Sequence, residues 1–171
     1  MKTLFVALRS VVYMTVFLLL WGWIALRVRA FDQSFGVSLP AAAEIPGVIL
    51  VVLGAALGLA CAGEFISRGR GTPAIFDAPR AFVASGPYRY VRNPMYIGGL
   101  ILLVGFGLFE RSISILLLAL LSFALVHLFV LFYEEPTLTR KFGSSYQEYL
   151  RAVRRWIPRW RPRDAAAHRV E

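Results

Sequence analysis

Four long apolar runs dominate the chain, separated by shorter stretches rich in charge, Gly and Pro. The runs cover residues 11–26, 45–66, 94–109 and 112–133. A helix needs about 20 apolar residues to cross a hydrocarbon core of about 30 Å, so the second and fourth runs suffice as they stand. The first reaches this length if it begins near Leu4 and Arg9 extends its charged end to the interface. The third covers about 24 Å as a helix, so it is either a thin span or a segment that starts within the headgroup layer.

The tail beyond Gly143 follows a different pattern. Its apolar and aromatic residues recur at steps of three and four: Tyr149, Val153, Trp156 and Trp160. This spacing predicts a basic amphipathic helix on the membrane surface up to about Pro158, with Ser145 and Glu148 as a capping box. The fold class is therefore all-α integral membrane, with about four transmembrane helices plus a C-terminal amphipathic interfacial helix. We divide it into two N-terminal spans, residues 1–66, and a core of residues 67–171.

Composition and charge support a membrane protein and set nucleic acid aside as a partner. Hydrophobic residues make up 58% of the 171 positions, against about 45–50% in soluble domains. The net charge of +9 comes from nineteen basic residues, most of them before the first run, after the second and after the fourth. By the positive-inside rule, both termini and the loop of residues 67–93 are cytoplasmic.

Two features of the N-terminal half carry simple interpretations. Val28-Arg29-Ala30 loosely fits a signal-peptide cleavage site, but the neighbouring charges and the bulky Trp21 and Trp23 argue against cleavage. Cys61 lies within the second run, where packing is the expected role. No spacing of Cys, His and carboxylates suggests a metal site.

The stretch "GPYRYVRNPMY", residues 86–96, is strongly polar for its place at the edge of an apolar run. Asn93 followed by Pro94 predicts a helix N-cap and first helical residue. A helix start favours an anion, and Arg89 and Arg92 add positive charge beside it. The stretch also contributes rings and open backbone through Tyr88, Tyr90, Tyr96, Gly98 and Gly99. It is either a pocket for a ligand with an anionic group and an aromatic ring, or an interfacial belt of tyrosines and arginines.

The fourth run closes with two adjacent glutamates, Glu134 and Glu135, and Pro136 is expected to stop the helix just beyond them. Negative charge at a helix C-terminus is unfavourable, so a compensating group is expected. Either both side chains lie in water beside Arg140 and Lys141, or at least one holds a cationic amino group or ribose hydroxyls.

Two further polar residues lie within the apolar runs. Glu64 either reaches the interface or faces a cavity beneath the loop. His127 shares a helix face with the glutamate pair, and a hydrogen bond to a neighbouring helix is a commoner role for such a residue than catalysis.

Together, these motifs resemble a known family. "SGPYRYVRNPMYIGG", followed after one apolar hairpin by "EEPTLTRKFGSSYQEYLRAVRRWIPR", is similar to the bacterial branch of the isoprenylcysteine carboxyl methyltransferase family. The Asn-Pro-Met-Tyr sequence is also similar to phosphatidylethanolamine N-methyltransferases. The resemblance covers about residues 72–159.

The resemblance implies an integral membrane methyltransferase that uses S-adenosylmethionine, with its active site on the cytoplasmic face of a bacterial inner membrane. It implies a cofactor site that draws on Asn93, Pro94, Tyr96, Gly98, Gly99, Glu134 and Glu135. From the rings and charges beside the helix start we add Tyr88 and Arg89 as cofactor-binding residues. We expect catalytic roles for Arg92 and Glu134. The implied partners are membrane lipids and a lipid-like or small hydrophobic methyl acceptor; the oligomeric state stays open.

One departure leaves the acceptor undecided among carboxylates, amines and thiols. Carboxyl-methylating relatives tend to carry an arginine in the turn before the glutamate pair, where this chain has residues 131–133, Leu-Phe-Tyr. A carboxylate acceptor would therefore need Arg89 or Arg92 instead.

Two other function classes remain alternatives. A sterol-type membrane reductase using NADPH has a similar C-terminal architecture, but tends to carry an acidic residue where this chain has Gly99. A non-catalytic four-span protein would leave the polar residues 86–96 unexplained.

Overall fold

The computed structural model describes residues 2–36, 38–69 and 84–160, and these residues form helices and no strands. The long helices are α1 (Lys2–Arg29), α3 (Glu44–Glu64), α4 (Pro94–Phe109), α5 (Ile113–Phe129) and α6 (Glu135–Ala152). Short elements are α2 (Asp32–Phe35), η1 (Ala41–Ala43), η2 (Phe65–Gly69), η4 (Gly86–Arg89) and η5 (Val130–Glu134). The predicted all-α class is confirmed.

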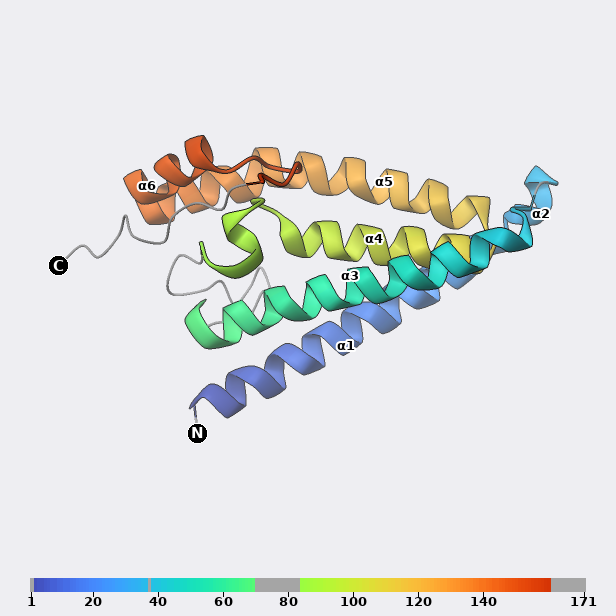
Figure 1. Cartoon of the computed structure of the whole chain (residues 1–171), viewed down its shortest axis with the longest axis horizontal. Coiled ribbons are helices and arrows are strands. Elements are labelled where there is room, and N and C mark those ends of the chain that lie inside the picture. The colour runs from blue at the N-terminus through green and yellow to red at the C-terminus, as the bar shows by residue number, and fades with distance from the viewer. Residues whose placement is uncertain (1, 37, 70–83, 161–171) are drawn as a thin grey trace.

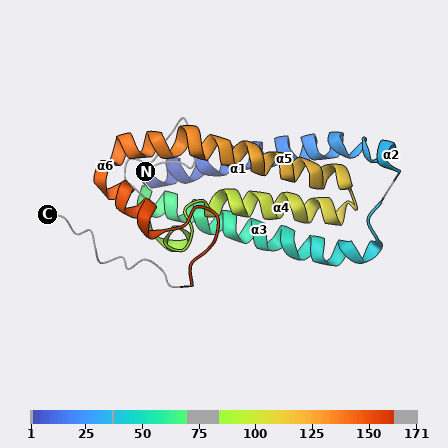
Figure 2. The ribbon, with the colours of Figure 1, turned by 90° about the horizontal axis from the view of Figure 1, so that it is seen from above.

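Four of the helices, α1, α3, α4 and α5, run side by side along the length of the molecule (Figures 1 and 2). Three apolar helical stretches are long enough to cross a membrane: residues 11–35, 41–67 and 113–152. The fourth, α4, begins at Pro94 as predicted and has 16 residues. The protein is thus an integral membrane protein with three long spans and one shorter apolar helix.

The two ends of this bundle differ, and we name them by their contents. The turn end holds α2 and the short α4–α5 connection, residues 110–112. The loop end holds η4, α6 and the described tail, residues 153–160 (Figure 1). The division of the chain at residues 66 and 67 stays a prediction.

Helices α3 and α4 pack most closely, because glycines face each other across the contact. A Cβ atom on Gly54 would lie 2.6 Å from the carbonyl oxygen of Gly98 and from the amide nitrogen of Leu102. On Gly105 it would lie 2.6 Å from the amide nitrogen of Val51. Gly54 therefore permits the close approach of α3 and α4, whereas a Cβ on Gly58 would meet no atom within 4 Å.

At the turn end, charges and caps join neighbouring loops. Arg29 pairs with Glu110 at 2.5 Å, and the Arg111 guanidinium donates to the Leu39 carbonyl at 2.7 Å. The start of α5 is capped twice: the Asp32 carboxylate accepts from the Ser114 amide at 2.8 Å, and the Ser112 hydroxyl accepts from the Ile115 amide at 3.1 Å. These contacts tie the α1–α3 connection to the α4–α5 connection.

The helix that carries the glutamate pair does not stop at Pro136, contrary to our expectation. The turn η5 is π-helical, and the Glu135 amide donates to the carbonyl of Val130, five residues back. Pro136 follows directly, in the first turn of α6, where the regular bonding pattern is already interrupted and a missing N–H is tolerated. The chain then continues as α6, and Gly143, with φ of +57°, bends it.

The predicted amphipathic helix is shorter than expected. It ends at Ala152, and the Ser145 hydroxyl donates to the Phe142 carbonyl at 2.7 Å, so the predicted capping box does not form. Val153 is extended, and the chain folds back onto the start of α4. The Arg92 amide donates to the Arg154 carbonyl at 2.9 Å, and the Arg159 amide donates to the Tyr90 carbonyl at 3.0 Å. Backbone C=O and N–H groups of the extended tail thus bond directly to Arg92 and Tyr90. A helix that continued to Pro158 would use these groups for its own hydrogen bonds, so it would prevent this contact.

Candidate functional site

The two adjacent glutamates lie at the loop end, at the junction of η5 and α6. Glu135 accepts from both of the arginines near it: Arg92 Nη1 lies 2.5 Å from its Oε1. Arg155 donates through Nε to Oε1 at 2.9 Å and through Nη2 to Oε2 at 2.8 Å. The three side chains are 12–25% exposed. One carboxylate therefore joins α6, the start of α4 and the tail.

Glu134 has a different environment. Its Oε2 accepts a hydrogen bond from the Tyr96 hydroxyl at 3.0 Å, and no other hydrogen bond to its side chain occurs within the described part of the chain. Tyr96 lies in the first turn of α4. Two adjacent carboxylates thus have unequal compensation, because two cations serve Glu135 and one neutral hydroxyl serves Glu134.

Arg92 retains one unused donor beside this pair. Its Nε is buried and has no hydrogen-bond acceptor among the described residues. A buried donor left without a partner costs about 1–3 kcal/mol, and more when the group is charged. An anionic group placed next to Arg92 would remove that cost.

The structure therefore brings together four of the residues expected at the site: Arg92, Tyr96, Glu134 and Glu135. Asn93 joins them indirectly, because its side-chain amide donates to the Arg155 carbonyl at 3.3 Å. It does not cap α4 with its side chain, although it holds the N-cap position as predicted.

Tyr88 and Arg89 lie in η4, and Pro94 is the first residue of α4. Tyr88 is buried against Phe65, and its carbonyl accepts from the Tyr149 hydroxyl at 2.7 Å. Burial raises the pKa of the Tyr88 phenol well above its ordinary value, so the phenol is neutral. Pro94 is fully buried and Arg89 is the last residue of η4.

The two glycines expected to leave room for a ligand differ. A Cβ on Gly98 would lie 3.0 Å from the Gly54 carbonyl oxygen, so α3 fills the space beside it. That expectation is wrong for Gly98, because the close contact of α3 and α4 uses this glycine. Gly99 is exposed and a Cβ there would meet nothing within 4 Å.

Arg155 was missed by the sequence reasoning, which named Arg140 and Lys141 beside the glutamates as one of two alternatives. Arg140 instead donates to the Thr137 hydroxyl at 3.4 Å. The hydrogen bonds that Arg155 donates to Glu135 raise the pKa of its guanidinium, which keeps its charge. The sequence offered no way to select Arg155 among the tail arginines, because the turn back after Ala152 brings it to the site.

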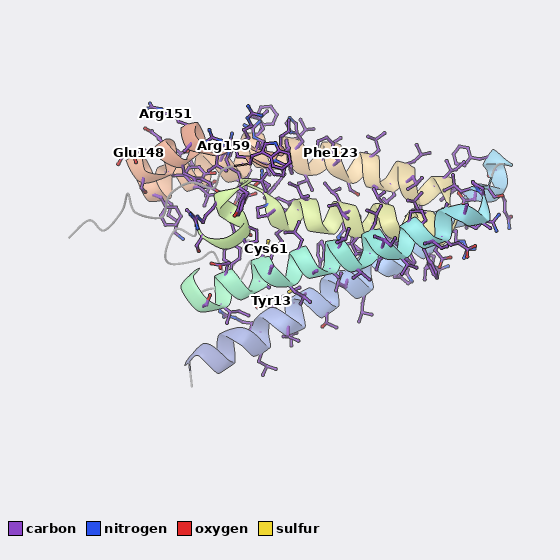
Figure 3. The ribbon with its side chains drawn as sticks, in the orientation of Figure 1. Tyr13, Cys61, Phe123, Glu148, Arg151 and Arg159 are labelled. Atoms are coloured by element: carbon purple, nitrogen blue, oxygen red, sulfur yellow. The ribbon has the colours of Figure 1, made fainter. Side chains whose placement is uncertain are left out.

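The structure also decides the two open questions about Glu64 and His127. The Ser85 hydroxyl donates to Glu64 Oε2 at 2.5 Å, so this carboxylate faces the loop. His127 Nδ1 accepts from Trp156 Nε1 at 2.9 Å. The Trp156 ring also contacts the Phe123 ring in an edge-to-face arrangement, with the ring centroids 5.3 Å apart. Figure 3 labels Phe123 on α5. Both residues therefore have structural partners, and that of His127 belongs to the tail.

Comparison with known proteins adds a family and two partial relatives. The phospholipid methyltransferase family matches residues 43–145. The nickel-cobalt-cadmium resistance protein NccN of Alcaligenes xylosoxydans xylosoxydans is 32% identical over 77 residues, which are 45% of this chain and 36% of the relative. The cobalt-zinc-cadmium resistance protein CzcN of Cupriavidus metallidurans is also 32% identical over 77 residues, 45% of this chain and 35% of the relative. The match thus spans about a third of the length of these relatives.

The family match covers α3, the loop, the α4–α5 hairpin and the first part of α6, and so includes the glutamate pair and its partners on α4. It confirms the resemblance to membrane methyltransferases seen in the motifs. The chain belongs to the phospholipid methyltransferase family.

Proposed function

We propose that this protein transfers a methyl group from S-adenosylmethionine to a lipid-like or small hydrophobic acceptor. The observation that carries the proposal is the buried Arg92 donor beside the unequally compensated glutamates. The amino acid part of S-adenosylmethionine has one carboxylate and one ammonium group. The carboxylate suits Arg92, whereas Glu134, whose carboxylate is bonded to a neutral hydroxyl, stays available to take a proton from the acceptor.

The residues present fit this cofactor in other respects. Glu135 holds Arg92 and Arg155 in place through bonds of 2.5–2.9 Å. Tyr146 is buried close enough to both glutamates and both arginines to feel their charges, so its ring can line the cofactor site beside them. Gly99, exposed one turn into α4, leaves backbone accessible.

A groove on the bilayer side of the bundle supports a hydrophobic acceptor. It has a volume of about 340 Å³, lies between α4 and α5 and has only apolar lining residues: Leu100, Val104, Leu116, Ala119, Leu120 and Phe123. Leu100 lies one helical turn after Tyr96, on the same face of α4. An acceptor chain in this groove would place a polar head near the Tyr96–Glu134 pair.

The chemistry asks little of the protein beyond alignment. The cofactor supplies a methyl group on a sulfonium, and transfer is an in-line displacement for which proximity and orientation account for most of the acceleration. For an amine or thiol acceptor, Glu134 would take the departing proton. For a carboxylate acceptor, Arg89 would have to position the charge, because Arg92 is assigned to the cofactor carboxylate, and no base would be needed.

We further propose that the loop end lies in the cytoplasm of a bacterial cell, with the protein in the inner membrane. The support is the charge distribution, because the basic residues of the tail and of residues 84–93 gather there. The names of the two relatives refer to metal resistance. Within the described residues, no group of three or more His, Cys, Asp or Glu side chains could hold a metal ion, so we propose no metal-binding role.

Calorimetric titration of the detergent-purified protein with S-adenosylmethionine and with NADPH tests the proposal. We expect saturable binding of S-adenosylmethionine, weakened at least tenfold by Tyr96→Ala and unchanged by Glu110→Gln at the turn end. Binding of NADPH alone would replace the proposal with a reductase, and binding of neither would favour a non-catalytic protein.

A further inference from the structure

A second apolar groove opens at the loop end, on a different side of α4. It has a volume of about 350 Å³ and is formed by α3, η4, the start of α4 and the tail. Its lining residues are Leu57, Pro87, Tyr90, Val91, Pro94, Ile97 and Pro158. None of them belongs to α5, which forms one wall of the α4–α5 groove. Ile97 lies about 100° around α4 from Tyr96, so this groove faces away from the Tyr96–Glu134 pair.

The rim of this groove carries a fixed positive charge. Arg159 directly follows Pro158, and its amide donates to the carbonyl of Tyr90 at 3.0 Å. Pro158 and Tyr90 both line the groove. The side chain of Arg159 is exposed and gives one nitrogen, Nη1, to the Ala152 carbonyl. Its other nitrogens have no acceptor within the described residues. Figure 3 labels Arg159 at the loop end.

The tail next to this rim exposes apolar side chains. Trp160 is fully exposed and Ile157 is 63% exposed. They flank Pro158 and Arg159, so aromatic, aliphatic and basic groups are gathered over one short segment. This combination is typical of a surface in the headgroup region of a bilayer, where rings and aliphatic groups insert and arginines contact phosphate.

We propose that this groove binds one acyl chain of an anionic glycerophospholipid, whose phosphate pairs with Arg159. The apolar lining matches a chain, the exposed guanidinium matches the headgroup charge, and basic segments next to a membrane attract anionic lipids. The bound lipid joins the tail to α3 and α4. It is a structural ligand, separate from the methyl acceptor, and the proposal does not depend on the proposed methyltransferase activity.

By joining the tail to α3 and α4, the lipid would also affect the glutamate–arginine cluster. The tail supplies Arg155 to Glu135, and only a few hydrogen bonds fix the tail to residues 90–93. A ligand that binds the folded state alone stabilises it by RT ln(1 + L/Kd), where L is the ligand concentration, so the stabilisation grows with the logarithm of that concentration. The lipid therefore stabilises the arrangement that completes the glutamate–arginine cluster.

Thermal unfolding in a neutral detergent, with defined lipids added, tests the proposal. We expect phosphatidylglycerol, at about 100 times its Kd, to raise the Tm by roughly 5 °C or more. Phosphatidylcholine should give at most a small increase, and inorganic phosphate none. Native mass spectrometry should show one phosphatidylglycerol retained per protein.

Variants locate the effect. Arg159→Gln should lose most of the increase caused by phosphatidylglycerol, and Arg159→Lys should keep most of it. The matched control is Arg151→Gln, which removes an exposed arginine from the outward face of α6 at the same end (Figure 3) and should keep the full increase. Comparing increments, with each variant measured with and without lipid, separates lipid binding from any loss of basal stability.

Three results would overturn the proposal. Equal increases with phosphatidylglycerol and phosphatidylcholine would exclude the pairing with Arg159. An equal loss in Arg159→Gln and Arg151→Gln would indicate diffuse attraction to the basic surface. An increase with inorganic phosphate alone would indicate a site for a soluble anion.

Discussion

The two ends of the bundle use the same kinds of side chain in different ways. At the turn end, Glu110 has one arginine, Arg29, at 2.5 Å, and Asp32 caps the start of α5. At the loop end, Glu135 has two arginines and its neighbour Glu134 has only a tyrosine hydroxyl. The Arg29 side chain is half exposed, whereas that of Arg92 is 14% exposed.

This difference separates a connection from a site. The charges of Arg29, Asp32, Glu110 and Arg111 at the turn end join neighbouring connections. The buried hydroxyl of Ser114, which has no partner within the described residues, is neutral. The corresponding group at the loop end is a buried guanidinium nitrogen of Arg92. Because an unpartnered charged donor costs more than a neutral one, the loop end has the stronger physical reason to bind a ligand.

Glu135→Gln should break the comparison most strongly. It removes the negative charge between Arg92 and Arg155, and we expect a loss of about 3 kcal/mol in the free energy of unfolding, because two largely buried cations lose their counterion. The matched change at the turn end, Glu110→Gln, should cost less than about 1 kcal/mol, since its partner Arg29 is half exposed. Unfolding in detergent measures both. Equal losses would show that the two ends are energetically alike.

Glu134→Gln should affect activity rather than folding. Gln can still accept the hydrogen bond from Tyr96, so we expect a change of less than about 1 kcal/mol in stability. For an amine or thiol acceptor, the rate of methyl transfer should fall about 100-fold, because no base removes the proton. The measurement is transfer of a radioactive methyl group from S-adenosylmethionine into lipid extracts of membranes containing the protein. An undiminished rate would exclude Glu134 as the base.

Two glycines with left-handed backbone conformations extend the comparison between the two ends of the bundle. Gly86 at the loop end and Gly36 at the turn end have φ of +55° and +62°. A Cβ on Gly86 would lie 2.6 Å from Glu64 Oε1, whereas one on Gly36 would meet nothing within 4 Å. Gly86→Ala should therefore cost about 2 kcal/mol, from backbone strain and the displaced Glu64–Ser85 bond, and Gly36→Ala about 1 kcal/mol, from strain alone. Thermal unfolding of both variants checks the order, and the reverse order would contradict it.

Trp156→Phe should have the smallest effect. It removes the hydrogen bond to His127 while a ring remains to contact Phe123, so we expect a loss of about 1 kcal/mol. Hydrogen exchange of residues 153–159 should rise, because the bond holds the tail to α5. Trp160→Phe, at a fully exposed position, is the control and should change neither measurement.

The elements that local chemistry specifies were predictable. Asn93 and Pro94 predicted the start of α4 correctly, because proline at the first helical position loses no hydrogen bond and has its φ preset for a helix. The apolar runs specified the helices, because only helices satisfy the backbone inside a bilayer. The pairing of residues 86–96 with Glu134 and Glu135 followed from one apolar hairpin between them.

The predictions that failed depended on how residues distant in the sequence are placed relative to one another. The Arg155–Glu135 bond requires the chain to turn back after Ala152, and no local pattern near Val153 announces that turn. Pro136 indicates the end of a regular helix, and only the π-helical turn before it makes a continuation possible. From the sequence alone, Gly98 was expected to leave its backbone open. The structure places Gly54 opposite to it, so α3 fills that space.

The π-helical turn η5 has a consequence for how this chain tolerates length changes. A π turn accommodates one residue more than an α turn, so removing a single residue within 130–133 would restore regular bonding without breaking the helix. The π turn already takes up this extra residue, so the helix beyond would keep its rotation about its axis relative to α5, and Glu134 and Glu135 would still face Tyr96 and Arg92. The same deletion in the regular part of α5 would instead rotate the helix beyond it by about 100°. This chain should therefore tolerate a one-residue deletion within 130–133 better than one within 120–126.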